Sequence, residues 1–357
     1  SAITASARLY VAPVAFATGD AARALVERGA ARPLAGGASA VTAAEVAVRA
    51  GETIATAVAP VAEFAAWNAP GVTAWLDALA AAPPSFAGAA LPAVVGIVNV
   101  TPDSFSDGGA HPGPSAAIEA GLRMWQAGAG LVDVGGESTR PGAAPVAPEE
   151  ELRRVLPVVE GLAGAGVRVS VDTRRAAVMA AALDAGAAAV NDVSALAGDP
   201  QSAAVVAAAR SSVILMHMQG EPATMQQDPR YRSAAHDVHD ALAARLVAAT
   251  AAGIAPDRIA IDPGIGFGKR IAHNLAILRS LAMFVALGRP VMVGLSRKGF
   301  IGRLGTGAAP ADRLGGSIAG ALWALARGAS LLRVHDVAAT VEAVALWRAF
   351  EGEGAAG

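Results

Sequence analysis

"VRVSVDTRRAAVMAAALDAGAAAVND", residues 167–192, carries two short apolar runs separated by an alanine-rich segment. The runs Val167–Asp172 and Ala188–Asp192 have the length and composition of buried strands, and the segment between them has the composition of a helix. Apolar strands that alternate with helices indicate a parallel sheet covered on both faces. This stretch therefore predicts a fold of the α/β class.

The same alternation extends on both sides of this stretch, from about residue 92 onward. Helical spacing of Ala, Leu and Arg is clearest in Glu149–Leu162 and Asp312–Arg327. Eight strand–helix units over about 260 residues predict a (β/α)8 TIM barrel. The alternative is a doubly wound open sheet, which usually has a glycine-rich turn after its first strand, and Asn99–Pro102 is not such a turn. The eight runs are Val94–Asn99, Leu131–Gly135, Val167–Asp172, Ala188–Asp192, Val213–Met218, Ile259–Asp262, Val291–Leu295 and Leu331–His335.

Residues 1–91 do not follow this alternation. Leu9–Phe16 has the pattern of a strand, Val72–Ala82 that of a helix, and Pro83-Pro84 reads as a linker. We therefore expect an N-terminal extension over residues 1–91 and a catalytic barrel over residues 92–357. The expected role of the extension is structural, as a small appended domain, a cover for the bottom of the barrel or an oligomer contact.

Composition excludes several classes of protein. Hydrophobic residues make up 54% of the chain and charged residues 16%, yet no apolar run reaches the roughly 20 residues of a membrane span. The net charge of −2 gives no global field for nucleic acid or an anionic membrane. Cysteine is absent, which excludes disulfides, thiolate catalysis and cysteine-ligated zinc. The first 20 residues make a poor secretory signal, so a cytoplasmic location is expected.

Polar side chains end or follow every predicted strand. A single Asp at a strand end is usually a helix cap and a single His is usually structural, so the prediction rests on their conjunction. In a barrel all eight carboxyl ends meet at one mouth, where enzymes of this fold keep their sites. Polar groups gathered there without a ligand would be costly to bury. They are Asn99, Glu137–Arg140, Asp172, Thr173, Asn191, Asp192, Met216–Met218, Asp262–Lys269, Ser296–Lys298, Arg333, His335 and Asp336.

Two groups within this set differ in chemistry. The first combines two carboxylates, an amide and a cation, which suits a flat polar heterocycle with N–H donors beside a carbonyl: Asp172, Asn191, Asp262 and Lys298, with Met216, Phe267 and the stem of Arg333 as faces of a slot. The second favours a phosphate or diphosphate, with an amide oxygen for Mg2+ at Asn99: Asn99, Thr139, Arg333 and His335.

Eight ordered motifs between about residues 92 and 350 resemble the dihydropteroate synthase family. The first, "GIVNVTPDSFSDGG" (96–109), changes from an apolar strand to nine polar residues with almost no packing groups. The others are "VDVGGESTRPGA" (132–143), "SVDT" (170–173), "NDVSA" (191–195), "LMHMQG" (215–220), "IDPGIGFGK" (261–269), "GLSRKGFIG" (294–302) and "RVHDV" (333–337).

The resemblance implies a transferase of folate biosynthesis. Such an enzyme condenses 6-hydroxymethyl-7,8-dihydropterin diphosphate with p-aminobenzoate, yields 7,8-dihydropteroate and releases diphosphate. It further implies Mg2+ at Asn99, inhibition by sulfonamides and a homodimer formed through barrel helices. It also implies that Thr101–Gly109 closes with Thr139–Ala144 over bound substrate, which would explain why that loop is not part of the packed core.

Residue roles follow from the resemblance as expectations. The pterin is bound by Asp172, Asn191, Met216, Asp262, Gly266, Phe267, Lys298 and Arg333, and the diphosphate by Asn99, Thr139, Arg333 and His335. The p-aminobenzoate is bound by Phe105, Arg140, Pro141, Lys298 and Gly299, and the catalytic residues are Asp172, Lys298, Asp107 and Arg140.

Position 299 departs from some family members, which carry Ser where this chain has Gly299, so only backbone N–H groups could contact the p-aminobenzoate carboxylate there. Two alternatives to the synthase are a pterin-binding methyltransferase barrel and an inactive pterin-binding homologue. The methyltransferase has no need of "TPDSFSDGG", "STRPGA" or "SRK", and the inactive homologue would favour loss of Asp172, Arg140 or Lys298, all of which are present.

Overall fold

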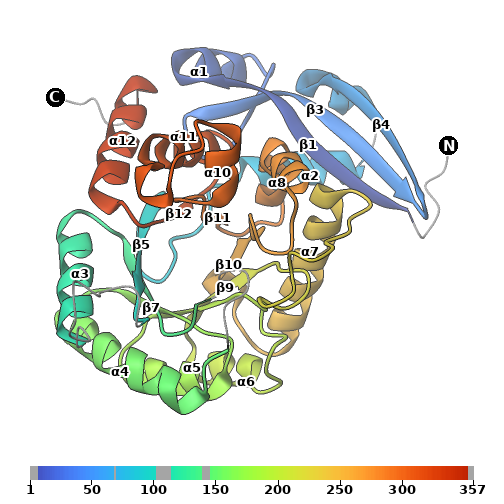
Figure 1. Ribbon diagram of the computed structural model, residues 1–357. Coiled ribbons are helices and arrows are strands. Elements are labelled where there is room, and N and C mark those ends of the chain that lie inside the picture. The colour runs from blue at the N-terminus through green and yellow to red at the C-terminus, as the bar shows by residue number, and fades with distance from the viewer. Residues whose placement is uncertain (1–6, 68–69, 102–113, 139–144, 353–357) are drawn as a thin grey trace.

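Eight parallel strands form a closed barrel in a computed structural model that describes residues 7–67, 70–101, 114–138 and 145–352 (Figure 1). Neighbouring strands follow chain order, β10-β9-β8-β7-β6-β5-β12-β11, and a parallel bridge between Ile261 and Val291 joins the two ends of the sheet. The predicted TIM barrel is confirmed. The strands are β5 (Ala93–Asn99), β6 (Leu131–Gly135), β7 (Val169–Asp172), β8 (Ala189–Asp192), β9 (Ser212–Met216), β10 (Ile259–Asp262), β11 (Met292–Val293) and β12 (Leu331–Val334).

The seventh strand is much shorter than its apolar run. The sequence predicts Val291–Leu295, but β11 covers only Met292–Val293. It pairs with β12 over those two residues, and Val291 before it makes only an isolated bridge to Ile261. Beyond it, Arg297 has a left-handed backbone (φ 59°), which no strand adopts. Hydrophobicity alone does not show where such a turn begins.

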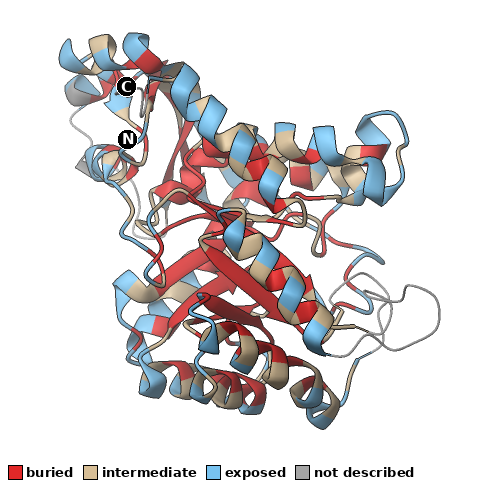
Figure 2. Ribbon diagram, turned by 90° about the vertical axis from the view of Figure 1, so that its left-hand side faces the viewer, coloured by how far each residue is buried: buried red, intermediate tan, exposed pale blue. Residues whose placement is uncertain are grey.

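Helices surround the barrel and keep their exposed faces outward (Figure 2). The helix that begins at Pro148 has three acidic residues in its first turn, which complement the helix dipole. Val155, Val158 and Leu162 belong to its buried face.

None of the described helices combines the length and hydropathy needed to cross a membrane. The helices around the barrel are α3 (Pro114–Gln126), α4 (Pro148–Gly164), α5 (Ala176–Asp184), α6 (Ser202–Ala209), α7 (Ala234–Ala251), α8 (Ile271–Arg279), α9 (Ala282–Val285), α10 (Gly299–Leu304), α11 (Leu314–Leu325) and α12 (Val337–Phe350), with short 3-10 turns η2 (Pro256–Arg258) and η3 (Pro310–Asp312).

The interior of the barrel is apolar at one end and charged at the other. Toward the amino ends of the strands, Val95, Leu131, Ile214 and Leu331 pack together with Phe86, which is fully buried. Phe86 reaches this position because residues 86–89 form a small hairpin, in which its backbone N–H donates to Ala89 O (3.1 Å). The segment directly after the predicted linker therefore places an aromatic side chain in the bottom of the barrel. The polar groups occupy the opposite end, where TIM-barrel sites lie.

The extension forms an antiparallel sheet on the outside of the barrel (Figure 1). Its strand order is β1-β3-β2, with β4 also paired to β3. The predicted strand and helix are both present, although each begins earlier than expected. The elements are β1 (Arg8–Thr18), α1 (Gly19–Glu27), β2 (Arg32–Pro33), β3 (Ser39–Ala50), β4 (Thr53–Pro60), the 3-10 helix η1 (Val61–Trp67) and α2 (Pro70–Ala80).

Polar and aromatic contacts fasten the extension to α7. Tyr10 OH donates to Asp240 (2.9 Å), Arg49 Nη1 donates to Asp237 (2.8 Å), and the Trp75 ring stacks on His239 with centroids 5.0 Å apart. Buried residues of β1, β3 and α2 belong to the same hydrophobic cluster as those of the barrel. The extension thus shares its core with the outer helices of the barrel, and its function stays a prediction.

Removal of the Arg49 guanidinium is expected to destabilise the protein by about 1.5–3 kcal/mol, because a charged hydrogen bond is lost in a largely buried place. Its side chain is only 14% exposed. Urea unfolding of Arg49→Met would measure the change. Arg8 pairs with Asp240 in the same interface but is 62% exposed, so Arg8→Met should cost less than about 0.5 kcal/mol. Equal losses in the two variants would contradict this account.

Candidate active site

A small cavity of about 70 Å³ opens at the carboxyl ends of the barrel strands. All four members of the first predicted group line it, together with the three side chains expected to face the heterocycle. The lining residues are Ile97, Asp172, Asn191, Val193, Met216, Asp262, Phe267, Met292, Gly294, Ser296, Lys298, Arg333 and His335. The convergence of strand ends that the sequence predicts is therefore present in the structure.

The three predicted acceptor residues of this cavity are strongly buried. Asp172, Asn191 and Asp262 are 8%, 3% and 4% exposed. Asn191 Nδ2 donates to Asp133 (2.9 Å), whereas its Oδ1 is buried and has no hydrogen-bond partner among the described residues. A buried acceptor without a donor is costly, so this oxygen indicates a ligand that brings an N–H group.

Phe267 and Lys298 form one side of the cavity. The Lys298 amine lies 4.7 Å from the centroid of the Phe267 ring, and it also donates to Ile265 O. Gly266 lies between Ile265 and Phe267 in the chain and has a φ of 88°. A Cβ at this residue would come within 3.3 Å of Lys298 Cδ. A glycine at this place leaves room for the lysine beside the ring. Since the flat face of Phe267 and a cation lie together here, this side suits an electron-rich ring.

Arg333 crosses the barrel interior and contacts two carboxylates. Its Nε donates to Asp133 (2.6 Å) and its Nη2 donates to Asp172 (2.7 Å). Asp133 is fully buried and also accepts from Ser170 and Asn191. Sequence reasoning missed Asp133 as a site residue. The available signal is that it is the one charged residue inside the apolar run Leu131–Gly135, and a charge buried in a strand needs a partner.

Burial shifts the pKa of the ionisable groups in this cavity. Burial raises the pKa of Asp172 to about 7, although Arg333 opposes the shift, and it raises the pKa of Asp262, which Lys298 opposes. Burial lowers the pKa of Lys298 to about 8. For Arg333, burial acts against the cation, but the carboxylates of Asp133 and Asp172 raise its pKa above the usual range. Asp172 and Lys298 therefore titrate close to neutral pH.

The second predicted group is only partly assembled in the described residues. His335 lines the cavity, and its backbone N–H and ring Nδ1 lie 3.2 and 3.0 Å from Ser296 Oγ. The sequence places Ser296 at the barrel mouth but gives it no role, and the structure shows that it orients this imidazole. Asn99 is the half-buried last residue of β5 and pairs with Gly135, but it does not line the cavity.

Most of the predicted p-aminobenzoate group lies outside the described residues. This applies to Phe105, Arg140 and Pro141, and also to Asp107 of the catalytic group and Thr139 of the diphosphate group. Gly299 is the exposed first residue of α10, directly after Lys298 at the N-cap. The backbone N–H group of Gly299, which is the predicted contact, therefore lies at the start of a helix beside the cavity.

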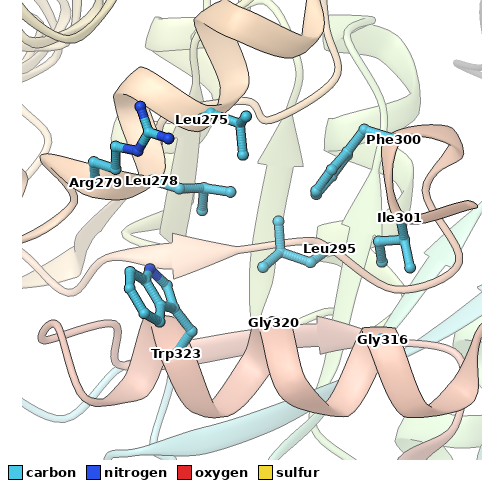
Figure 3. A pocket seen from close by; sticks show the side chains of 9 residues that line it. All are labelled: Leu275, Leu278, Arg279, Leu295, Phe300, Ile301, Gly316, Gly320 and Trp323. Carbon is cyan, nitrogen blue, oxygen red and sulfur yellow. The ribbon is translucent and has the colours of Figure 1, made fainter. Parts of the chain in front are cut away.

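A second, larger cavity of about 290 Å³ lies on the outside of the barrel, between α8, α10 and α11 (Figure 3). Its lining is almost entirely apolar, with Leu278, Leu295, Phe300 and Trp323 as the largest groups and Arg279 as the one charged residue. It has no group of converging polar side chains, so the charged cavity at the barrel mouth is the better candidate for catalysis despite its smaller volume.

Comparison with known proteins identifies the family. The sequence model of the family described as pterin binding enzyme matches residues 95–335. The dihydropteroate synthase of Neisseria meningitidis serogroup B is 46% identical over 263 residues, which cover 72% of this chain and 92% of that protein. This chain belongs to the dihydropteroate synthase family. The resemblance drawn from the eight motifs is confirmed.

Solved structures of the dihydropteroate synthase family support the same assignment. The Xanthomonas albilineans enzyme, solved with 4-aminobenzoic acid, is 51% identical, with a TM-score of 0.69 and coverage of 73% of this chain and 93% of that chain. The Yersinia pestis enzyme, solved with a sulfonamide drug complex, is 45% identical, with a TM-score of 0.70 and coverage of 73% and 95%. The family is enzymatic, and the predicted transferase class is confirmed.

Proposed function

We propose that this chain condenses 6-hydroxymethyl-7,8-dihydropterin diphosphate with p-aminobenzoate to give 7,8-dihydropteroate and diphosphate. The observation that carries the proposal is the buried Asn191 Oδ1, which has no partner among the described residues and belongs to a residue that lines the cavity beside two carboxylates. Such a set accepts hydrogen bonds from an N–H-rich heterocycle. Support also comes from the related Xanthomonas albilineans enzyme, which was solved with 4-aminobenzoic acid.

In this proposal the pterin enters the slot beside Phe267. Asp172, Asn191 and Asp262 accept from its ring and amino N–H groups, and Lys298 donates to its carbonyl oxygen. Met216 and Arg333 form further faces of the slot, and Gly266 allows close approach beside Lys298. All of these residues except Gly266 line the mouth cavity.

The reaction begins with cleavage of the bond between the pterin methylene carbon and the diphosphate oxygen. The electron pair leaves with the diphosphate, and the ring system carries the resulting positive charge. The ionised carboxylate of Asp172 stabilises that charge through the ring, because a fixed charge in a buried site acts strongly. The neutral arylamine then attacks the carbon with its lone pair, and its extra proton passes to solvent after the new bond has formed.

The leaving diphosphate is held by Asn99, Thr139, Arg333 and His335 in this proposal. Among the described residues no cluster of three or more His, Cys, Asp or Glu side chains is arranged for a metal ion. Mg2+ usually keeps several waters and binds substrate phosphates, so it takes few ligands from the protein. Asn99 would supply its amide oxygen, and the bound ion would neutralise charge on the leaving diphosphate.

The remaining predictions also belong to this proposal. We place p-aminobenzoate, or a sulfonamide in competition with it, between Lys298, Gly299 and the residues Phe105, Asp107, Arg140 and Pro141. We propose a homodimer formed through barrel helices, which the half-exposed Trp323 on α11 supports, and sedimentation velocity would test it. Cell fractionation would test a cytoplasmic location.

A direct assay tests the proposed reaction. Purified protein with pterin diphosphate, p-aminobenzoate and Mg2+ should form dihydropteroate and diphosphate in equal amounts. Omission of p-aminobenzoate should stop formation of dihydropteroate, and a sulfonamide should inhibit competitively against p-aminobenzoate. Absence of both products in the complete mixture would overturn the proposal.

The pH profile is expected to be bell-shaped for kcat/KM of pterin diphosphate. Below a pH of about 7 the pKa of Asp172 predicts protonation of its carboxylate and a loss approaching about tenfold per pH unit. Above a pH of about 8 the pKa of Lys298 predicts loss of its cation. Steady-state kinetics from pH 5 to 9.5 would measure both limbs. Retention of the acidic limb in Asp172→Asn would assign it to another group.

A further inference from the structure

Lys269 is a buried amine that does not line the cavity at the mouth. Lys269 is 3% exposed. It directly follows the glycine-rich turn Gly264–Gly268, which comes after β10. The amine nitrogen lies 2.8 Å from Gly264 O and 3.0 Å from Phe267 O. It also lies 3.2 Å from His217 O and 3.0 Å from His217 Nδ1, on the loop that follows β9. One side chain therefore ties two neighbouring loops together.

The two loops are packed without space for side chains between them. Gly264 (φ 66°) and Gly268 (φ 60°) both have left-handed backbones, and a Cβ on either would come within 1.9 Å of His217 O or 2.2 Å of Gln219 O, respectively. The phenol of Tyr231, on the same neighbouring loop, donates to Gly268 O (2.9 Å). The turn is thus held against the β9–α7 loop at both of its ends.

The opposite side of this turn faces the proposed pterin slot. Phe267 belongs to the turn and lines the cavity, and Lys298 donates to Ile265 O on the same turn. The turn therefore lies between two lysines, with Lys269 behind it and Lys298 inside the cavity. Any shift of its backbone would move the Phe267 ring and the acceptor that orients Lys298.

The burial of an amine here is costly, and its contacts explain how the cost is offset. Burial lowers the pKa of Lys269 to about 7, and the carboxylate of Asp262 opposes this shift. Burial lowers the pKa of His217, and the nearby Lys269 cation lowers it further, to about 3. The His217 ring is therefore neutral, and its Nδ1 can accept a hydrogen bond from the Lys269 amine. Lys269 donates hydrogen bonds in either charge state, and an apolar side chain of similar length would fill the same space without holding the carbonyl groups.

We propose that Lys269 is a positioning residue for the pterin half-site: it holds the turn Gly264–Gly268 so that Phe267 forms a fixed wall of the slot. This inference rests on the proposed function. In this proposal Lys269 does not contact substrate. Its effect reaches the site chiefly through Phe267, which belongs to the pterin slot and not to the p-aminobenzoate residues, so pterin binding should change far more than p-aminobenzoate binding.

The test compares Lys269→Met with wild type and with a matched control. Arg245→Met removes a different, half-buried cation. Arg245 also donates to a backbone carbonyl at the mouth, Ala195 O (2.8 Å), but it does not contact the turn. In Lys269→Met the KM for pterin diphosphate should rise about tenfold, with changes below about threefold in kcat and in the KM for p-aminobenzoate. Arg245→Met should leave all three parameters near wild type.

Two milder variants keep the test decisive if Lys269→Met does not fold. Lys269→Gln retains an N–H donor, and Tyr231→Phe removes only the bond to Gly268 O, so each should raise the KM for pterin diphosphate about threefold. Calorimetry with pterin diphosphate should give matching changes in the dissociation constant. A wild-type KM and dissociation constant for pterin diphosphate in every folded variant would overturn the inference. If the wild-type enzyme forms no dihydropteroate, the proposed function is overturned instead.

Discussion

Asp172→Asn is expected to lower turnover about 100-fold, which corresponds to a loss of roughly 3 kcal/mol of transition-state stabilisation. The substitution keeps the size of the side chain and its place at the end of β7 but removes the charge that faces the pterin cation. Arg333 would still be held by Asp133, so the barrel interior should remain assembled. Steady-state kinetics with saturating substrates would measure the loss.

Asp192 supplies the control for this variant. It is a buried carboxylate at the end of the adjacent strand, but it accepts from the backbone N–H groups of Ser194 and Leu196 and does not line the cavity. Asp192→Asn should therefore lower stability and leave kcat within about threefold of wild type. Near-normal turnover in Asp172→Asn would mean that Asp172 serves the fold and not the reaction.

Arg333→Met is expected to cost about 3–5 kcal/mol of folding stability, since removal of one partner leaves buried carboxylates uncompensated. Asp133 is 0% and Asp172 9% exposed at the side chain, and Arg333 donates to both. Denaturant unfolding at pH 7 would measure the change in the free energy of unfolding.

The double variant Asp133→Asn, Arg333→Met tests the cause of that loss. Asn at position 133 removes the buried charge and keeps groups that can bond Ser170 and Asn191, so part of the stability should return. If the double variant is less stable than Arg333→Met by the full cost of Asp133→Asn alone, the two groups do not interact energetically and the pairing argument fails.

Local sequence carries most of the fold and the outline of the site. The strands are mostly apolar because helices cover them, so their positions follow from hydrophobicity. Their carboxyl ends converge by the geometry of the barrel. The first-group residues Asp172, Asn191, Asp262 and Lys298 could be found in that way without any contact information.

The roles of residues that act through distant partners could not be found in that way. Asp133 gains its role from Arg333, 200 positions along the chain, and Ser296 gains its role from His335. Lys269 looks like one more basic residue after a glycine-rich loop until its amine is seen among backbone carbonyls. The attachment of the extension also depends on pairs such as Arg49 and Asp237, which no local pattern joins.

Phe86 has a consequence for any attempt to isolate the barrel. Composition suggests a cut just before residue 92, but the aromatic ring that seals the floor of the barrel lies upstream of that cut, among Leu131, Ile214 and Leu331. A shortened chain that begins at Ala90 would lose this ring and leave an apolar cavity open to water. A chain that begins at Pro83 would keep the ring. Inactivity of the shorter chain would then reflect the loss of Phe86 from the barrel interior. It would say nothing about the antiparallel sheet of the extension, which the deletion was meant to test.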